Sequence, residues 1–184
     1  MRNANGSLTW RAGMPPIHYC THSLGPLLFL MEDRCVAATG LNTGCNIAPE
    51  LGAIDLQVGL FQTESGAIVK ILCGFSIERH PAFHWYIVYG TKGALESQRR
   101  YKESVSGYAQ EIVPNREMTL HEIDSNAHGT AEYRIADGFI RSILDDTKPP
   151  IDVYEAMDYT APGICAHLSS ERKGEVVPVP NYRG

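Results

Sequence analysis

Two apolar runs joined by a short turn constrain the fold of this chain more than any other feature. Residues 54–63 and 67–77 are rich in Ile, Val, Leu and Phe, and Glu64-Ser65-Gly66 separates them. Runs of this length that flank a short turn with Gly favour an antiparallel hairpin. The first run begins with alternating residues, in which Asp55 and Gln57 give the strand one polar face. The hairpin therefore predicts a sheet whose other face is covered by helices or further strands.

Other segments complete an α+β pattern around the hairpin. Further strands are expected at residues 34–42, 83–89, 94–97 and 110–113. Apolar residues at helical spacing mark residues 17–31, 131–146 and 153–170. Gly25-Pro26 should kink or restart the first helix, and Asp152 should cap the third. We predict an α+β fold, with an open, predominantly antiparallel β-sheet and helices packed on one face.

The length and the net charge of the chain limit its possible domain organisation and its possible classes of partner. With 184 residues, 43% of them hydrophobic, the chain can bury a core, and we expect an irregular lead-in at residues 1–17 and a single α+β domain at residues 18–184. A net charge of −5 without a basic block argues against nucleic acid as a partner. The longest apolar run, residues 27–31, falls well short of the roughly 20 residues of a membrane span. We therefore expect neither a nucleic-acid nor a membrane partner.

The cysteines and the N-terminus suggest a cytoplasmic protein. The five cysteines are widely spread and form no C-x-x-C pair, so we interpret them as buried small hydrophobes in a reducing compartment. The first residues show neither the apolar core of a secretory signal nor an Arg-rich amphipathic leader. These features predict a cytoplasmic location.

The segment from His18 to His22 holds the densest group of chemically useful side chains. Two imidazoles spaced four residues apart share one face of a helix, and imidazole transfers protons near neutral pH. An alternative hypothesis is that both histidines only satisfy backbone groups at a kinked helix start. A metal site would need a third ligand from distant candidates, namely His80, His84, His121 or His128. We expect no metal.

Two weaker signals lie farther along the chain. Arg79 follows a predicted strand, where its charge could meet a polar ligand or simply be solvated. His128 and Gly129 precede a predicted helix and could present an imidazole and backbone N–H groups, or form only a flexible helix entry. We predict that His18, Tyr19 and His22 line one pocket wall together with Arg79 and His128.

The order of several motifs resembles a known family. They are the stretch Tyr-x-Thr-His-x-Leu-Gly-Pro at Tyr19–Pro26, the turn at Tyr89–Gly93, His128-Gly129, residues 149–154, and the ending Pro-Asn-Tyr-Arg-Gly. This order resembles the C-terminal domain of the Gfo/Idh/MocA oxidoreductases. It is most similar to the branch that contains the NAD-dependent glycosidases acting on N-acetylgalactosaminides.

The resemblance implies that the chain is one domain of a longer enzyme. Such enzymes have an N-terminal Rossmann domain, which binds NAD or NADP, and a C-terminal α+β domain, whose open sheet often forms the subunit interface. By this resemblance the cofactor of the full-length parent is bound mainly by the missing Rossmann domain, and the chain alone should not bind it tightly. The implied partners are a carbohydrate or polyol substrate and a second copy of the protein, which would associate through the sheet, with residues 83–89 as a candidate contact.

The resemblance also assigns roles to individual residues. Family members commonly carry an Asp-x-x-x-His pair beside a Lys from the cofactor domain; His22 matches the His, whereas His18 stands at the Asp position. The implied catalytic residues are His22 and His18, and the implied substrate-binding residues are Tyr19, Arg79 and His128. The expected reaction is oxidation of a sugar or cyclitol hydroxyl. The alternatives are an NAD-dependent glycoside hydrolase and a non-catalytic dimerisation or binding module.

Overall fold

The computed structural model describes residues 2–78, 84–100, 103–109, 112–118 and 127–184, without the side chains of 112–118 and 127–131. The chain forms two compact units, the first from residues 1–78 and 151–184 and the second from residues 79–150. Each unit is described by itself. The prediction of one domain over residues 18–184 remains a prediction.

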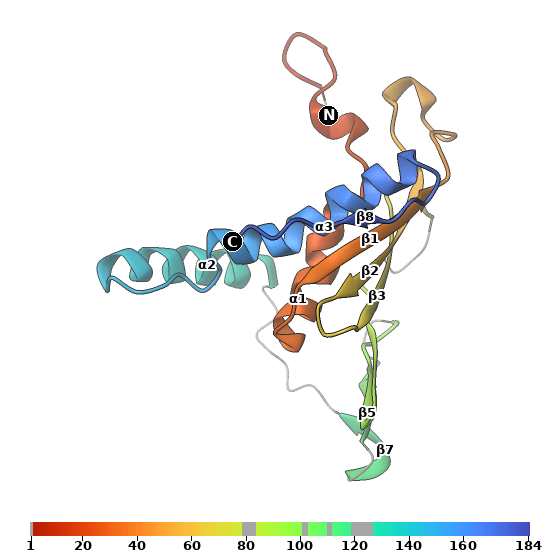
Figure 1. The fold of residues 1–184 in the computed structure, drawn as a ribbon. Helices are drawn as coiled ribbons and strands as arrows, with labels where there is room; N and C mark the ends of the chain where they lie inside the picture. The colour runs from red at the N-terminus through yellow and green to blue at the C-terminus, as the bar shows by residue number, and fades with distance from the viewer. Residues whose placement is uncertain (1, 79–83, 101–102, 110–111, 119–126) are drawn as a thin grey trace. The chain divides into compact units, whose positions relative to one another are not determined.

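The first unit is built on a four-stranded antiparallel sheet. Its strands are β1 (Cys35–Asn42), β2 (Leu56–Thr63), β3 (Ile68–Gly74) and β8 (Val177–Pro178), in the order β3-β2-β1-β8 (Figure 1). The predicted hairpin is confirmed: β2 pairs with β3, and Gly66 adopts a φ of +90° in the turn between them. This left-handed conformation favours glycine, which explains the turn.

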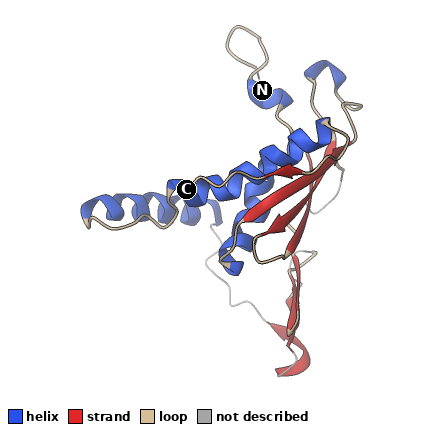
Figure 2. Ribbon diagram, in the orientation of Figure 1, coloured by secondary structure: helices blue, strands red, loops and turns tan. Residues whose placement is uncertain are grey.

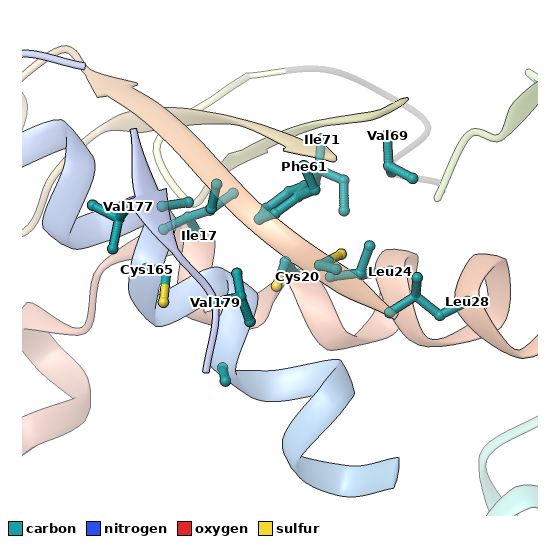
Figure 3. Close-up of a cluster of buried hydrophobic side chains, with 14 residues drawn as sticks. Ile17, Cys20, Leu24, Leu28, Phe61, Val69, Ile71, Cys165, Val177 and Val179 are labelled. Carbon is teal, nitrogen blue, oxygen red and sulfur yellow. The ribbon is translucent and has the colours of Figure 1, made fainter. Parts of the chain in front are cut away.

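Helices cover one face of this sheet. They include η2 (Pro16–Cys20), α1 (Thr21–Met31) and α3 (Val153–Glu171), while η1 (Trp10–Gly13) and η3 (Pro49–Leu51) are short 3₁₀ turns. Leu24 and Leu28 of α1 and Phe61 of β2 are buried in the core between helices and sheet (Figure 3). The predicted helix at residues 17–31 is therefore two segments, and α1 continues through Pro26 rather than restarting there.

Two glycines let α3 lie unusually close to its neighbours. A Cβ on Gly40 would lie 2.1 Å from the carbonyl oxygen of Ala166, and a Cβ on Gly163 would lie 2.7 Å from that of Ile17. Neither position has room for a side chain, so α3 packs directly on the backbones of β1 and η2. This contact fixes the place of α3 over the segment that contains the predicted site.

The start of α3 and the residues after it are held by specific polar contacts. Asp152 accepts a hydrogen bond from the Glu155 backbone N–H, and the Glu155 carboxylate accepts one from the Asp152 N–H, as a capping box does. The predicted Asp152 cap is thus confirmed. Beyond α3, Val179 donates its N–H to the Val36 carbonyl, and Arg183 forms an ion pair with Asp158, Nη2 to Oδ2 at 2.8 Å.

The second unit has its own antiparallel sheet and one helix. The strands β4 (Ile87–Gly90), β5 (Gly93–Glu96), β6 (Val105–Ala109) and β7 (Ile112–Met118) pair in chain order, and α2 (Ala127–Leu144) follows them (Figure 2). The segments expected at 83–89 and 94–97 contribute to this second sheet instead of extending the first. The predicted α+β class with an open antiparallel sheet is confirmed.

No helix in the described parts of the chain combines the length and the apolar character that crossing a membrane requires.

The packing of the core predicts that two leucines of α1 contribute very differently to the free energy of unfolding. Leu28 is 1% exposed and Leu30 is 74% exposed. We expect Leu28→Ala to lower the free energy of unfolding by about 2–5 kcal/mol, because it leaves a cavity between helix and sheet. Leu30→Ala should change it by less than about 0.5 kcal/mol. Urea unfolding followed by far-UV circular dichroism measures both, and equal losses would contradict the proposed packing.

Candidate functional site

The predicted site begins where η2 passes into α1. Pro16 lies in the first turn of η2, where a missing N–H costs nothing. The next residue, Ile17, donates its backbone N–H to Oε1 of Gln57 at 3.1 Å. Ile17, Cys20 and Leu24 point into the core. The residues between them are therefore left nearer the surface.

Three aromatic side chains gather at this surface, and we call Tyr19, His22 and Phe75 the aromatic cluster. The rings of Tyr19 and His22 stack with a tilt of 34° and centroids 4.5 Å apart. Phe75, which follows β3, meets Tyr19 edge to face at 5.6 Å. Tyr19 is 38% exposed and Phe75 is 57% exposed. Such a cluster can contact the C–H face of a ring while an imidazole and a phenol bind hydroxyl groups.

His18 has different surroundings from His22. Its ring meets that of His167 of α3 edge to face, with centroids 5.1 Å apart. In the described part of the chain its Nε2 atom is buried without a hydrogen-bond partner. Burial lowers the pKa of His18, and the nearby His167 lowers this pKa further. Burial therefore favours the neutral form of the His18 ring, which packs against His167 of α3.

A buried amide connects this region to the sheet and to α3. Gln57 is 1% exposed. Because its Oε1 accepts from Ile17, its Nε2 is the donor, to Nδ1 of His167 at 3.2 Å and to Oγ of Ser170 at 3.1 Å. Sequence reasoning placed Gln57 on the polar face of its strand, which is wrong, because this side chain is buried and faces α3. The same reasoning missed His167, for which the sequence pattern gave no signal.

Two predicted site residues cannot be placed beside this cluster. Arg79 lies outside the described residues, and so does the side chain of His128. Their position in one pocket wall with Tyr19 and His22 therefore stays a prediction. Among the described residues, no three His, Cys, Asp or Glu side chains come together in a group that could hold a metal ion.

The thiols of the first unit are buried or partly buried. Burial raises the pKa of Cys20 to about 12, and burial also raises the pKa of Cys35 to about 12 and that of Cys73 to about 11. A thiol must ionise to attack a substrate, so burial makes these thiols poor nucleophiles. The polar groups of the aromatic cluster itself are the imidazole of His22 and the phenol of Tyr19.

Two helix starts in the described part of the chain are candidate places for dinucleotide phosphates. A helix N-terminus with free N–H groups suits such phosphates. At α3, however, the capping box of Asp152 and Glu155 places two carboxylates on these groups. The start of α1 continues directly from η2 and has no glycine-rich turn before it. These two helix starts do not fit a pyrophosphate.

Comparison with known proteins shows which folds the chain resembles. No family model matches it. A curated relative, "Glycosyl hydrolase family 109 protein" of Streptomyces filamentosus, is 27% identical over 203 residues, which cover 94% of this chain and 41% of the relative. A levoglucosan dehydrogenase, solved with NADH and L-sorbose, is 13% identical with a TM-score of 0.75 over 99% of this chain and 56% of that chain. The chain has the Gfo/Idh/MocA fold.

Further structures with this fold match the chain to a similar extent. An Agrobacterium radiobacter oxidoreductase, solved with NAD+, L-tartaric acid and magnesium, has a TM-score of 0.67 at 14% identity over 86% of this chain and 47% of that chain. This chain thus spans about half the length of the proteins it matches. The Gfo/Idh/MocA resemblance, drawn from motifs of the C-terminal domain, is confirmed at the level of the fold.

The lowered pKa of His18 predicts how stability depends on pH. The unfolded chain binds a proton at His18 near pH 6.5, whereas the folded chain binds it only at lower pH. The free energy of unfolding therefore keeps its full value above about pH 6.5. It decreases as the pH falls from there through the pKa of His18 in the folded chain. An NMR titration of this imidazole should give a midpoint below 6.5. His18→Gln should lose less stability than the parent between about pH 7.5 and 5; identical pH slopes would contradict the assignment.

Proposed function

We propose that the chain is the substrate-binding and subunit-interface domain of an NAD(P)-dependent oxidoreductase that acts on a hydroxyl of a sugar or cyclitol. The observation that carries this proposal is the stacking of His22 on Tyr19 beside Phe75, within the Gfo/Idh/MocA fold. The printed names of structures with this fold support the substrate class. They include levoglucosan dehydrogenase and the myo-inositol 2-dehydrogenase of Lactobacillus plantarum.

The aromatic cluster suits a polyhydroxylated ring. The apolar C–H face of such a ring packs on exposed aromatic rings, and Tyr19 and Phe75 offer two at right angles. Hydroxyl groups at the ring edge then lie within reach of the Tyr19 phenol and the His22 imidazole. Arg79 and His128 are proposed to bind the remaining hydroxyls, which would hold the ring in one orientation.

His22 is the proposed proton-transfer group. The imidazole of His22 would accept the O–H proton of the substrate hydroxyl. A bound nicotinamide cofactor would supply the hydride acceptor for the carbon of that hydroxyl. Stacking on Tyr19 restricts the ring plane of His22, which keeps the accepting nitrogen in one direction. His18 is proposed to act through packing: its ring projects from η2 onto His167 of α3 and supports the segment that presents Tyr19 and His22.

A second candidate function is supported by the curated relative. The glycosyl hydrolase of Streptomyces filamentosus covers 94% of this chain. In an NAD-dependent glycosidase the same base would act first, because a ring carbon is oxidised transiently before the aglycone leaves and is reduced afterwards. The cofactor is regenerated in each cycle. The two candidates therefore differ in net NADH and not in the site.

Activity of a full-length protein that contains this chain tests the proposal. With sugars or cyclitols and NAD(P), we expect reduced cofactor to accumulate, measured by its absorbance. His22→Ala should lower kcat by about 10²-fold or more, the scale of lost acid–base catalysis, and His18→Ala should lower it less.

Release of an aglycone without net NADH would favour the glycosidase. Turnover of the His22→Ala protein at the parent rate would remove His22 from its proposed role, whichever reaction is run.

The outer face of the first sheet is the proposed subunit contact. Leu41, Leu60, Ile68 and Leu72 lie on the face opposite the helices, and their exposures run from 45% to 65%. Adjacent exposed apolar residues of this kind are typical of interaction surfaces. In a two-fold dimer the same face of both copies would be covered.

Light scattering on the 184-residue chain tests this contact. At about 50 µM we expect a dimer or larger oligomer, because association by mass action covers the outer face. Leu72→Glu should shift the chain to monomer by placing a charge on that face. The matched control, Leu30→Glu on exposed α1, should leave the oligomer intact. A parent chain that is monomeric under these conditions would refute the proposal.

A further inference from the structure

The second unit contains a surface hollow that the proposed reaction does not use. It has a volume of about 390 Å³ and lies at the tip of the β4–β5 hairpin, in the green part of Figure 1. Its lining includes Tyr89, Thr91, Lys92, Ala94 and Tyr108. Pockets of this size can hold a single small ring compound.

Strand register places the two tyrosines on opposite sides of this hollow. Tyr89 of β4 lies directly opposite Ala94 of β5, and Ala94 lies opposite Tyr108 of β6. Residues directly opposite one another in a sheet share a face. With strands about 4.8 Å apart, the two tyrosine backbones are separated by about 10 Å, and only a methyl group lies between them. This separation leaves room for one ring between the two phenols.

The tyrosines are not used to stabilise the unit. Tyr89 is 82% exposed and Tyr108 is 46% exposed. The close pairing of β5 and β6 beneath them depends on Gly93, since a Cβ there would lie 2.3 Å from the carbonyl oxygen of Tyr108. Gly93 and Gly90 also add no side chain to the hollow. Two aromatic faces, a methyl floor and the hydroxyls of both tyrosines and Thr91 match the mixed C–H and O–H surface of a pyranose ring.

The charged side chains around the hollow indicate which ring compounds it can bind. Lys92 is the one cation of the lining, which contains no carboxylate. The carboxylate on the same face of β5, Glu96, is held by Arg99 and by the indole N–H of Trp85. Among the ion pairs of the described residues, none involves Lys92. The ammonium group is therefore available to a negatively charged substituent of a ligand.

We propose that this hollow binds a pyranose ring that carries one anionic substituent, a carboxylate or a phosphate. The ring lies between Tyr89 and Tyr108 over Ala94, and the anionic group pairs with Lys92. The residues of this hollow belong to the second unit, whereas the aromatic cluster belongs to the first. Binding at the hollow does not depend on the proposed oxidoreductase function.

Two-dimensional NMR of the isotopically labelled 184-residue chain tests the proposal. The probes are glucuronic acid, glucose 6-phosphate, uncharged glucose and benzoate. Either or both anionic sugars should shift the amide signals of residues 89–94 and 108 saturably, and the tighter one identifies the anionic group. Glucose should bind at least about tenfold more weakly, because it lacks the charge that meets Lys92.

Variants assign the binding to the named side chains. Tyr89→Ala should weaken binding of the anionic sugar by about tenfold, and Lys92→Gln should remove the preference over glucose. Tyr133→Ala, at an exposed tyrosine of α2, and Lys173→Gln, at an exposed lysine after α3, are the matched controls and should leave binding unchanged. Retained dispersion of the spectra shows that each variant is folded.

Three results would overturn the proposal. The first is that neither anionic sugar produces saturable shifts. The second is that the Tyr89→Ala and Lys92→Gln chains bind the anionic sugar with the same affinity as the parent chain. The third is that benzoate binds as tightly as the sugars. The last result would show that the hollow recognises a planar anion and not a pyranose ring.

Discussion

The side-chain amide of Gln57 is the contact through which sheet, η2 and α3 are held in one arrangement. Its oxygen accepts from the first turn of η2, and its nitrogen donates to His167 and Ser170 of α3. Buried without these partners, an amide would cost about 1–3 kcal/mol, so only one relative placement of the three elements satisfies it. This amide thereby also fixes the start of the segment that carries Tyr19 and His22.

The hairpin shows how far periodicity determines a fold. Its strands and turn were predictable from alternating and continuous apolar residues, but the buried face was not. Gln57 and Thr63 face the helices, while Leu60 and Leu72 lie on the open face. An alternating pattern shows that a strand has two different faces, but it does not show which face is buried. The buried face is decided here by the polar partners that α3 provides. Ser170 and His167 supply those partners from the far end of the sequence.

The side chains of the candidate site pair differently from what a helix over these residues would predict. A spacing of four predicted that His18 and His22 share a face. Residues Pro16–Cys20 are instead a 3₁₀ helix, with about three residues per turn. The ring that stacks on His22 is consequently that of Tyr19, three residues earlier, and His18 meets His167. Local spacing could not predict that contact, since it depends on the close approach of α3 at Gly163.

The first unit is discontinuous in sequence, and this has a consequence for its synthesis. Strands β1 to β3 leave the ribosome before residues 79–150, whereas α3 and the residues that contribute Val177, Val179 and Arg183 follow afterwards. Until then η2 and α1 are the helices available to cover the face that carries Phe61, and Nε2 of Gln57 lacks its partners His167 and Ser170. A nascent chain stalled within residues 79–150 therefore presents a partly open apolar sheet, the kind of surface that chaperones bind and that promotes aggregation.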